Sequence, residues 1–204
     1  DGQTKYKAIL DEYFEYPKDT YQDLTTLRDK IKNSKDLKIF EKQIKSIEKE
    51  ITLFHGRAAN KILKKTKINV DFIGFHGQTI YHNAKKKISK QLGDGKLLSK
   101  LTKKTVVYNF RENDLDNGGE GAPLAPIFHQ LMVKENKIDL PVCILNIGGI
   151  ANITALSSYE PKDLKSYDIG PGNCLIDEWV RKKTKKKYDD NGQIAKTGKI
   201  SEII

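Results

Sequence analysis

The pattern of apolar and polar positions predicts that the first third of the chain is mainly helical. From about residue 21 to residue 66, apolar side chains recur three or four positions apart, with lysine and glutamate between them. This spacing is typical of amphipathic helices that bury one face. Before them, residues 6–16 mix aromatic and charged side chains and are followed by Pro17, which predicts an edge strand that leaves into a turn.

Beyond residue 67 the pattern changes to short apolar runs, each closed by glycine or by polar residues. We predict three strands there, over residues 70–75, 88–92 and 105–110. In an open α/β sheet, ligands bind in the crevice beyond the strand ends. The polar residues that follow these strands are therefore candidates for a binding site.

A further helix and a passage between two lobes are predicted in the middle of the chain. The helix is expected to begin near Ala122, because Pro123 and Pro126 are tolerated only close to a first turn. Residues 134–141 are mostly polar and end in proline, which indicates a passage into a second lobe.

The second lobe is predicted to begin with a β-hairpin in the stretch CILNIGGIANIT, residues 143–154. Gly148 and Gly149 separate its two apolar runs, and we expect a tight turn that requires positive φ. Successive backbone N–H groups of such a turn point into one concavity, which binds phosphate oxygens. Asn146 and Asn152 flank the turn and offer further donors; a purely structural hairpin is the alternative.

Asp168 is the candidate general base. It is predicted to end a strand and is followed by a rigid Gly-Pro-Gly loop, so its carboxylate is held in place, as a general base requires. Asn173 follows this loop and is well placed to cap a helix. The alternative is that Asp168 is a turn carboxylate that hydrogen-bonds its own loop.

Three further polar residues follow predicted strands. His76 and Gln78 place neutral donors and acceptors at the crevice, which suits sugar hydroxyls. Arg111 offers a planar fork that suits a carboxylate or a phosphate. Each has a structural alternative, since His76 and Gln78 can satisfy neighbouring backbone groups and Arg111 can pair with Glu112 or Asp114.

Charge and composition limit the class of protein. The chain has 204 residues and a net charge of +10, but its lysine clusters are spread over several elements with almost no interleaved aromatic residues. Nucleic-acid binding uses such aromatics for stacking, so a solvated lysine-rich surface is favoured. No apolar run is long enough for a membrane span. We expect a cytoplasmic globular chain without nucleic-acid or membrane partners.

The cysteines and histidines do not indicate a metal site. The two cysteines, Cys143 and Cys174, are expected to be small core residues without a disulfide. The remaining histidines lack the spacing with carboxylates that metal sites show and are interpreted as structural: His55, His82 and His129. The glycine-rich Walker pattern and the Gly-x-Ser-x-Gly elbow are both absent from the sequence.

Taken in order, the motifs GFHGQT, QLGDG, NFREND, GGEGAPLAPIFH, LNIGGIANIT and YDIGPGN resemble those of the bacterial 1,6-anhydro-N-acetylmuramic acid kinases. The resemblance runs from about residue 50 to the C-terminus. It implies an α/β, actin-like architecture of two lobes, each a ribonuclease-H-like mixed sheet with flanking helices. Residues 1–137 would be the first lobe without its N-terminal phosphate loop, and residues 138–204 the start of the second.

The resemblance also implies a reaction and roles for the candidate residues. The kinases use ATP and Mg²⁺ to open the 1,6-anhydro ring of the amino sugar by hydrolysis and phosphorylate O6, giving N-acetylmuramic acid 6-phosphate in peptidoglycan recycling. Asp168 would be the catalytic base. The nucleotide side would be formed by Asn146, Gly148, Gly149 and Asn152, and the sugar side by His76, Gln78, Arg111 and Asn173. No protein metal ligand is assigned, and a homodimer is possible.

The chain departs from the family pattern in three respects. Asn109 stands where an aspartate is usual. Residues 1–18 do not match the family's phosphate loop, and the glycine-rich segment that holds the adenosine would lie beyond Ile204. We therefore expect a truncated kinase that is inactive alone, with a non-catalytic sugar-binding or pseudokinase fragment of the same fold as the alternative.

Overall fold

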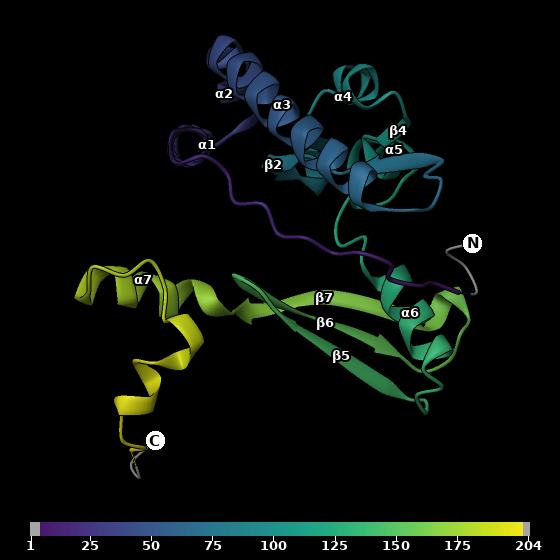
Figure 1. The fold of residues 1–204 in the computed structure, drawn as a ribbon. Coiled ribbons are helices and arrows are strands. Elements are labelled where there is room, and N and C mark those ends of the chain that lie inside the picture. The colour runs from purple at the N-terminus through teal and green to yellow at the C-terminus, as the bar shows by residue number, and fades with distance from the viewer. Residues whose placement is uncertain (1–4, 202–204) are drawn as a thin grey trace. The chain divides into compact units, whose positions relative to one another are not determined.

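The computed structural model describes residues 5–201 and shows a mixed α/β chain (Figure 1). Its helices are α1 (Lys18–Lys30), α2 (Ser34–Ile39), α3 (Glu41–Lys65), α4 (Gly95–Thr102), α5 (Phe110–Asp116), α6 (Pro126–Glu135) and α7 (Asn173–Lys183). Its strands are β1 (Phe72–Phe75), β2 (Gln78–Asn83), β3 (Ile88–Leu92), β4 (Thr105–Tyr108), β5 (Val142–Ile147), β6 (Ile150–Leu156) and β7 (Leu164–Pro171).

The described chain forms two compact units. The first comprises residues 7–124, and the second comprises residues 125–201 together with residues 5 and 6. Helix α6 belongs to the second unit, where it packs against β6 and β7. The lobes expected at residues 1–137 and 138–204 stay a prediction.

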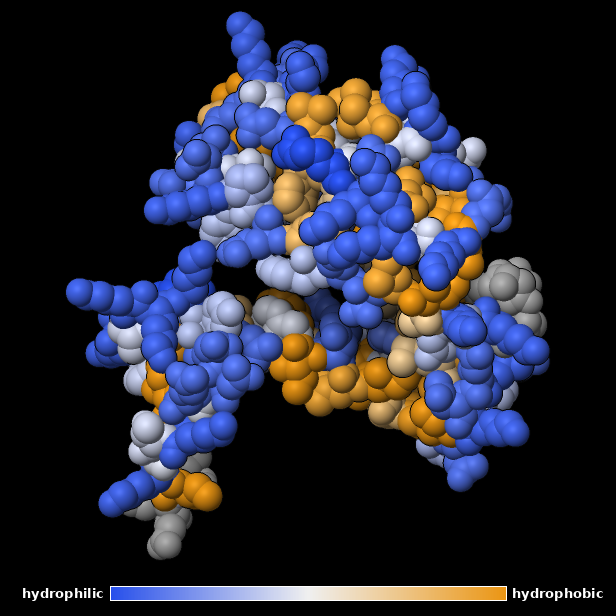
Figure 2. Space-filling model, viewed as in Figure 1, coloured by the Kyte–Doolittle hydropathy of each residue, from blue (hydrophilic) through white to orange (hydrophobic). Residues whose placement is uncertain are grey.

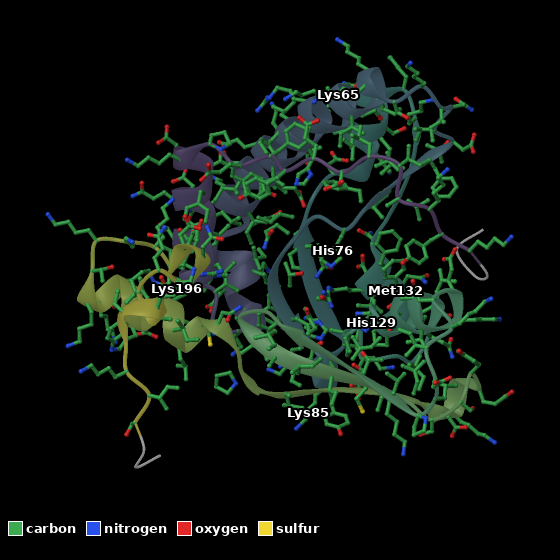
Figure 3. The ribbon with its side chains drawn as sticks, turned by 60° about the horizontal axis from the view of Figure 1, so that its bottom comes forward. Lys65, His76, Lys85, His129, Met132 and Lys196 are labelled. Carbon is green, nitrogen blue, oxygen red and sulfur yellow. The ribbon has the colours of Figure 1, made fainter. Side chains whose placement is uncertain are left out.

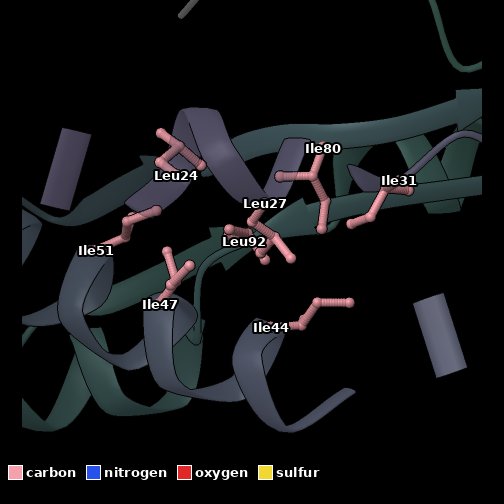
Figure 4. Packing of buried hydrophobic residues seen from close by; sticks show 8 residues of the cluster. All are labelled: Leu24, Leu27, Ile31, Ile44, Ile47, Ile51, Ile80 and Leu92. Carbon is pink, nitrogen blue, oxygen red and sulfur yellow. The ribbon is translucent and has the colours of Figure 1, made fainter. Parts of the chain in front are cut away.

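The core of the first unit lies between two helices and a hairpin. The apolar stripe expected on the long helix packs against α1 and against β2 and β3 (Figure 4). The buried cluster consists of Leu24, Leu27, Ile31, Ile44, Ile47, Ile51, Ile80 and Leu92. Full burial of one such side chain stabilises the fold by about 1.5–3 kcal/mol, so this cluster is the main reason that α3 has its observed orientation on the hairpin.

The predicted helical region is confirmed but is divided into three helices. Helices α2 and α3 are divided at Phe40. Helices α1 and α2 are divided at Asn33, whose side chain accepts a hydrogen bond from the N–H of Lys35 while the Asp36 carboxylate accepts one from the N–H of Asn33. This reciprocal pair is a capping box, which starts a new helix.

The edge strand expected at residues 6–16 is wrong, since that segment has no regular secondary structure. Side chains hold it instead. Glu12 forms ion pairs with Lys61 and Lys65 of α3, and the Tyr16 hydroxyl lies 2.8 Å from His55 Nε2. Residues of the segment also border a hollow of about 340 Å³ beside α3. Tyr16 of the segment therefore packs against α3 rather than in a sheet.

The three strands predicted in this unit are confirmed, and a fourth was missed. Strand β1 pairs in parallel with β4, while β3 pairs with β2 as an antiparallel hairpin. The sequence of β2, QTIYHN, is mainly polar and does not show the expected alternation. Strand β4 ends at Tyr108 rather than at Phe110, because Asn109 has φ of 61° and turns the chain into α5.

The second unit is built on an antiparallel sheet in the order β5, β6, β7. The predicted hairpin is confirmed as β5 and β6, and β7 leads directly into α7 (Figure 1). Helix α6 begins at Pro126 rather than near Ala122, with proline in its first turn. His129 of α6, labelled in Figure 3, lies 2.9 Å from the hydroxyl of the buried Thr154 on β6, so a polar contact fixes this helix to the sheet.

One part of this sheet is apolar and exposed. Leu145, Ile147, Tyr167 and Ile169 are each more than half exposed, and Figure 2 shows apolar side chains gathered over the strands. The expectation that Cys143 is a core residue is wrong, because it lies on the edge strand β5 and is exposed. Among the described residues, no helix is long and apolar enough to cross a membrane.

Candidate active site

Three polar residues that were predicted separately form one row across the second unit's sheet. Asn146 on β5 is opposite Asn152 on β6, and Asn152 is opposite Asp168 on β7. Directly opposed residues of antiparallel strands project from the same face, with Cβ atoms about 4.5–5.5 Å apart. The sheet register therefore brings two amides and one carboxylate together.

Asp168 is held by a strand rather than by a loop. Strand β7 continues past it to Pro171, so the expectation that the strand ends at Asp168 is wrong. The side chain is exposed and forms no hydrogen bond or ion pair with another described residue. The alternative that it bonds its own loop is therefore not supported. An unpaired carboxylate on a paired strand is available to accept a proton from water.

The turn between β5 and β6 differs from the expected one. Neither Gly148 nor Gly149 has positive φ, so the expectation of a positive-φ turn is wrong. Their carbonyl groups face the loop after β7: the Gly149 oxygen accepts from the N–H of Gly172 (2.9 Å) and the Gly148 oxygen from that of Asn173 (2.8 Å). Within the described chain, neither turn glycine donates its N–H to a loop acceptor. These two N–H groups are available to an anion.

Gly172 is required by the close approach of this loop to the turn. A Cβ atom at Gly172 would lie 2.3 Å from the Gly148 oxygen, which is backbone and cannot move aside cheaply. The Gly-Pro-Gly sequence thus fits the loop against the hairpin and connects the turn to the strand that carries Asp168.

Asn173 has a different role from the helix cap that was expected. It is the first residue of α7, Gly172 is the N-cap, and no side chain caps this helix. The Asn173 side-chain amide donates to the Ile147 carbonyl (3.1 Å) at the end of β5. Asn173 also lines a hollow of about 460 Å³ together with Asp177 and Asp189.

Asp177 and Asp189 were missed by the sequence interpretation. The only available signal for Asp177 is its position one helical turn after Asn173. The Asp189 carboxylate accepts hydrogen bonds from the backbone N–H groups of Ile194 and Ala195, which hold its pKa below the usual value. Asp189 therefore has a structural task in this loop.

In the first unit, two of the predicted sugar residues meet. Arg111 Nε donates to His76 Nε2 at 2.9 Å, and Arg111 Nη1 donates to the Gly121 carbonyl at 2.8 Å (Figure 3 shows His76). His76 Nδ1 lies 2.9 Å from the Gly77 oxygen. Burial lowers the pKa of Arg111 below its usual range. Gln78 is half-buried on β2, and its side chain forms no hydrogen bond with another described residue.

The described residues contain no group of three or more histidine, cysteine, aspartate or glutamate side chains placed to hold a metal ion. The other histidines have structural partners: His55 with Tyr16, His82 with Ser89, and His129 with Thr154.

Comparison with known proteins gives the family. The family model described as anhydro-N-acetylmuramic acid kinase matches residues 2–204. The chain belongs to the anhydro-N-acetylmuramic acid kinase family. The match begins well before residue 50, where the resemblance in motifs starts, so it also includes the helical region.

Relatives in the anhydro-N-acetylmuramic acid kinase family support this membership. A protein of that name from Pelagibacter ubique is 59% identical over 204 residues, which cover all of this chain and 54% of the relative. One from Rhizobium etli is 40% identical over 162 residues, 78% of this chain and 43% of the relative. One from Zymomonas mobilis is 44% identical over 153 residues, which cover 74% of this chain and 41% of the relative. The chain spans about half the length of the curated relatives it matches.

Proposed function

We propose that the chain is part of an ATP-dependent kinase that hydrolytically opens the 1,6-anhydro ring of anhydro-N-acetylmuramic acid and phosphorylates O6. The product is N-acetylmuramic acid 6-phosphate, and the reaction serves peptidoglycan recycling in the cytoplasm. The proposal includes a two-lobe actin-like architecture for the whole enzyme. The observation that carries it is the row of Asn146, Asn152 and Asp168 beside a glycine turn with two unpaired N–H groups.

In the proposed mechanism, Asp168 takes a proton from water. The water oxygen forms a bond to the anomeric carbon, and the bond between that carbon and the bridging oxygen breaks. The released oxygen, O6, attacks the γ-phosphorus of ATP, and ADP leaves. Exposure of Asp168 and its lack of a protein partner support its role as the base, because a paired carboxylate is a poorer proton acceptor.

The nucleotide side of the proposal rests on the Gly148–Gly149 turn. Its free N–H groups would bind phosphate oxygens, and the side-chain oxygens of Asn146 and Asn152 suit a hard cation. Mg²⁺ is commonly bound through one or two protein groups together with substrate phosphates and waters. A set of a few oxygen donors therefore fits Mg²⁺, which would neutralise charge on the transferred phosphoryl group.

The sugar side of the proposal comprises His76, Gln78, Arg111 and Asn173. Gln78 supports it most simply, because its amide is half-buried and makes no hydrogen bond with another described residue. Asn173 keeps its side-chain oxygen available while its nitrogen is bound to Ile147. Neutral amides of this kind suit sugar hydroxyl groups.

The test uses a chimera in which the 204 residues replace the matching part of the Pelagibacter ubique relative. Formation of the 6-phosphate from ATP, Mg²⁺ and the anhydro sugar would be followed by mass spectrometry. We expect Asp168→Asn to lower the rate by about 10²–10⁴-fold, the usual contribution of a general base. Asp139→Asn is the matched control, because Asp139 is also an exposed aspartate of the second unit and should tolerate the change.

Near-normal turnover by a folded Asp168→Asn chimera would exclude Asp168 as the base. An unsubstituted chimera that binds the sugar but forms no product would instead favour the alternative of a non-catalytic sugar-binding protein. Circular dichroism of each variant separates loss of chemistry from loss of fold.

A further inference from the structure

Arg111 is a half-buried cation whose protein partners are both neutral. Its Nε–H is bound by His76 and one Nη1–H by the Gly121 carbonyl. A guanidinium has five N–H donors. Three of them are therefore left without a partner among the described residues, two on Nη2 and one on Nη1.

The acidic residues beside Arg111 do not neutralise it. Asp114 is engaged elsewhere, because its Oδ2 accepts a hydrogen bond from the N–H of Gly121 at 2.8 Å. Glu112 is exposed and forms no ion pair with a described residue. The interpretation that Arg111 pairs with either residue is therefore wrong. A half-buried cation that lacks a counter-charge has lost part of its hydration, which favours the binding of an anion.

His76 orients the guanidinium without adding charge. The Gly77 carbonyl can only accept, so His76 Nδ1 must carry the proton in that contact, and Nε2 is then the acceptor for Arg111 Nε. The two contacts together define a neutral imidazole in one tautomer. It fixes one edge of the guanidinium and leaves the opposite end to a ligand.

We propose that Arg111 binds the carboxylate of the substrate's lactyl group and that His76 is the positioning residue for it. This inference rests on the proposed function for the identity of the sugar. A guanidinium fork matches a planar carboxylate with two parallel hydrogen bonds. The free backbone N–H groups suited to phosphate belong to the Gly148–Gly149 turn of the other unit, which favours the carboxylate over the nucleotide as the partner of Arg111.

The test is binding of two sugars to the 204-residue chain, measured by titration calorimetry. The sugars are 1,6-anhydro-N-acetylmuramic acid and 1,6-anhydro-N-acetylglucosamine, which lacks the lactyl group. We expect the unsubstituted chain to bind the acid more tightly by about ten- to hundredfold, the range for hydrogen bonds between charged groups. Arg111→Gln should remove this preference, while Arg57→Gln, which removes an exposed arginine of the same unit, should keep it.

Variants of His76 test the positioning role. His76→Gln keeps an acceptor for Arg111 and should retain part of the preference for the acid, whereas His76→Leu should lose it. If His76 were needed only for folding, its replacement would instead lower the affinity for both sugars equally. Thermal unfolding of each variant identifies any that fail to fold.

Equal affinity for the two sugars, no detectable binding of either, or an unchanged preference in Arg111→Gln would overturn the proposal. The proposal would also be overturned if Arg111→Gln no longer bound inorganic phosphate but still preferred the acid over the neutral sugar, since Arg111 would then bind phosphate rather than the carboxylate. Binding of the two sugars does not depend on phosphoryl transfer. A chain that prefers the acid through Arg111 but yields an inactive chimera would refute the proposed reaction and leave the carboxylate site standing.

Discussion

His55 shows at the scale of one residue how burial creates a pH dependence. Its ring packs against Tyr16, Phe54 and Phe75, and its Nε2 lies 2.8 Å from the Tyr16 hydroxyl. Burial lowers the pKa of His55 below its usual value of 6.5, because the charged form is poorly solvated there. The neutral ring is therefore the form that the folded chain stabilises.

We predict that the free energy of unfolding falls as the pH drops below 6.5, the usual histidine value. In that range the unfolded chain binds the His55 proton and the folded chain does not, so lower pH favours unfolding. Urea unfolding between pH 7.5 and about pH 5, above the range in which carboxylates titrate, measures the slope. The variant His55→Gln keeps a partner for Tyr16 and should show a smaller slope; an equal slope would assign the effect to other groups.

Single residues also show which local features a sequence can predict. Asn109 has a φ of 61°, a left-handed conformation that asparagine tolerates well. A side-chain preference of this kind can be read from sequence. The pairing of Arg111 with His76 cannot, because it depends on a contact between residues 35 positions apart.

At the scale of elements, the sequence predicts best what periodicity encodes. The stripe on α3 and the hairpin of β5 and β6 follow from spacing and glycine placement, and both are confirmed. Strand β2 was missed because its sequence, QTIYHN, is mainly polar and lacks the alternation of a strand. Its hydrogen-bonded pairing with β3 holds it as a strand, and such pairing cannot be read from periodicity. The strand predicted at residues 6–16 is wrong for the opposite reason: the aromatic residues there suit a strand, but Tyr16 packs against a helix.

The contact between the loop after β7 and the hairpin turn leads to a prediction about Gly172. Gly172→Ala would place a Cβ atom 2.3 Å from the Gly148 oxygen, so the loop must shift and lose its bonds to the turn. We expect a cost of about 1–3 kcal/mol in the free energy of unfolding, as for other overpacked sites. Gly148→Ala is the control, since its Cβ would meet only an ordinary contact at 3.5 Å and its φ is not positive.

Urea unfolding of both variants decides this prediction. If Gly172→Ala were as stable as the unsubstituted chain, the loop would not be fitted against the turn as described. If Gly148→Ala were the more damaging change, the turn would need positive φ after all.

At the scale of the whole molecule, the candidate site residues divide between the two compact units. Asn146, Asn152 and Asp168 belong to one unit, and His76 and Arg111 to the other. Sequence motifs predicted each of these residues, because polar residues at strand ends and glycine turns are local features. The cross-strand row was not predicted, since it depends on the register of three strands and on a bulge at Ile169, directly after Asp168.

The exposed apolar side chains of the β5–β7 sheet lead to a prediction about self-association. Contiguous apolar surface on a soluble chain favours association, and Leu145 and Ile147 are 53% and 57% exposed on the edge strand β5. We expect the double variant Leu145→Ser, Ile147→Ser to shift the chain towards monomer in sedimentation experiments over a range of concentrations. Its thermal unfolding should change little, because both side chains lose little burial on replacement.

Leu156→Ser is the contrasting variant, since Leu156 lies on the same sheet but is only 1% exposed. It should lower the free energy of unfolding by about 2–5 kcal/mol, the range for truncating a buried leucine. Association that persists unchanged in the double variant would show that a homodimer, if formed, uses another surface. Unfolding of the double variant as severe as that of Leu156→Ser would show instead that β5 is covered in solution.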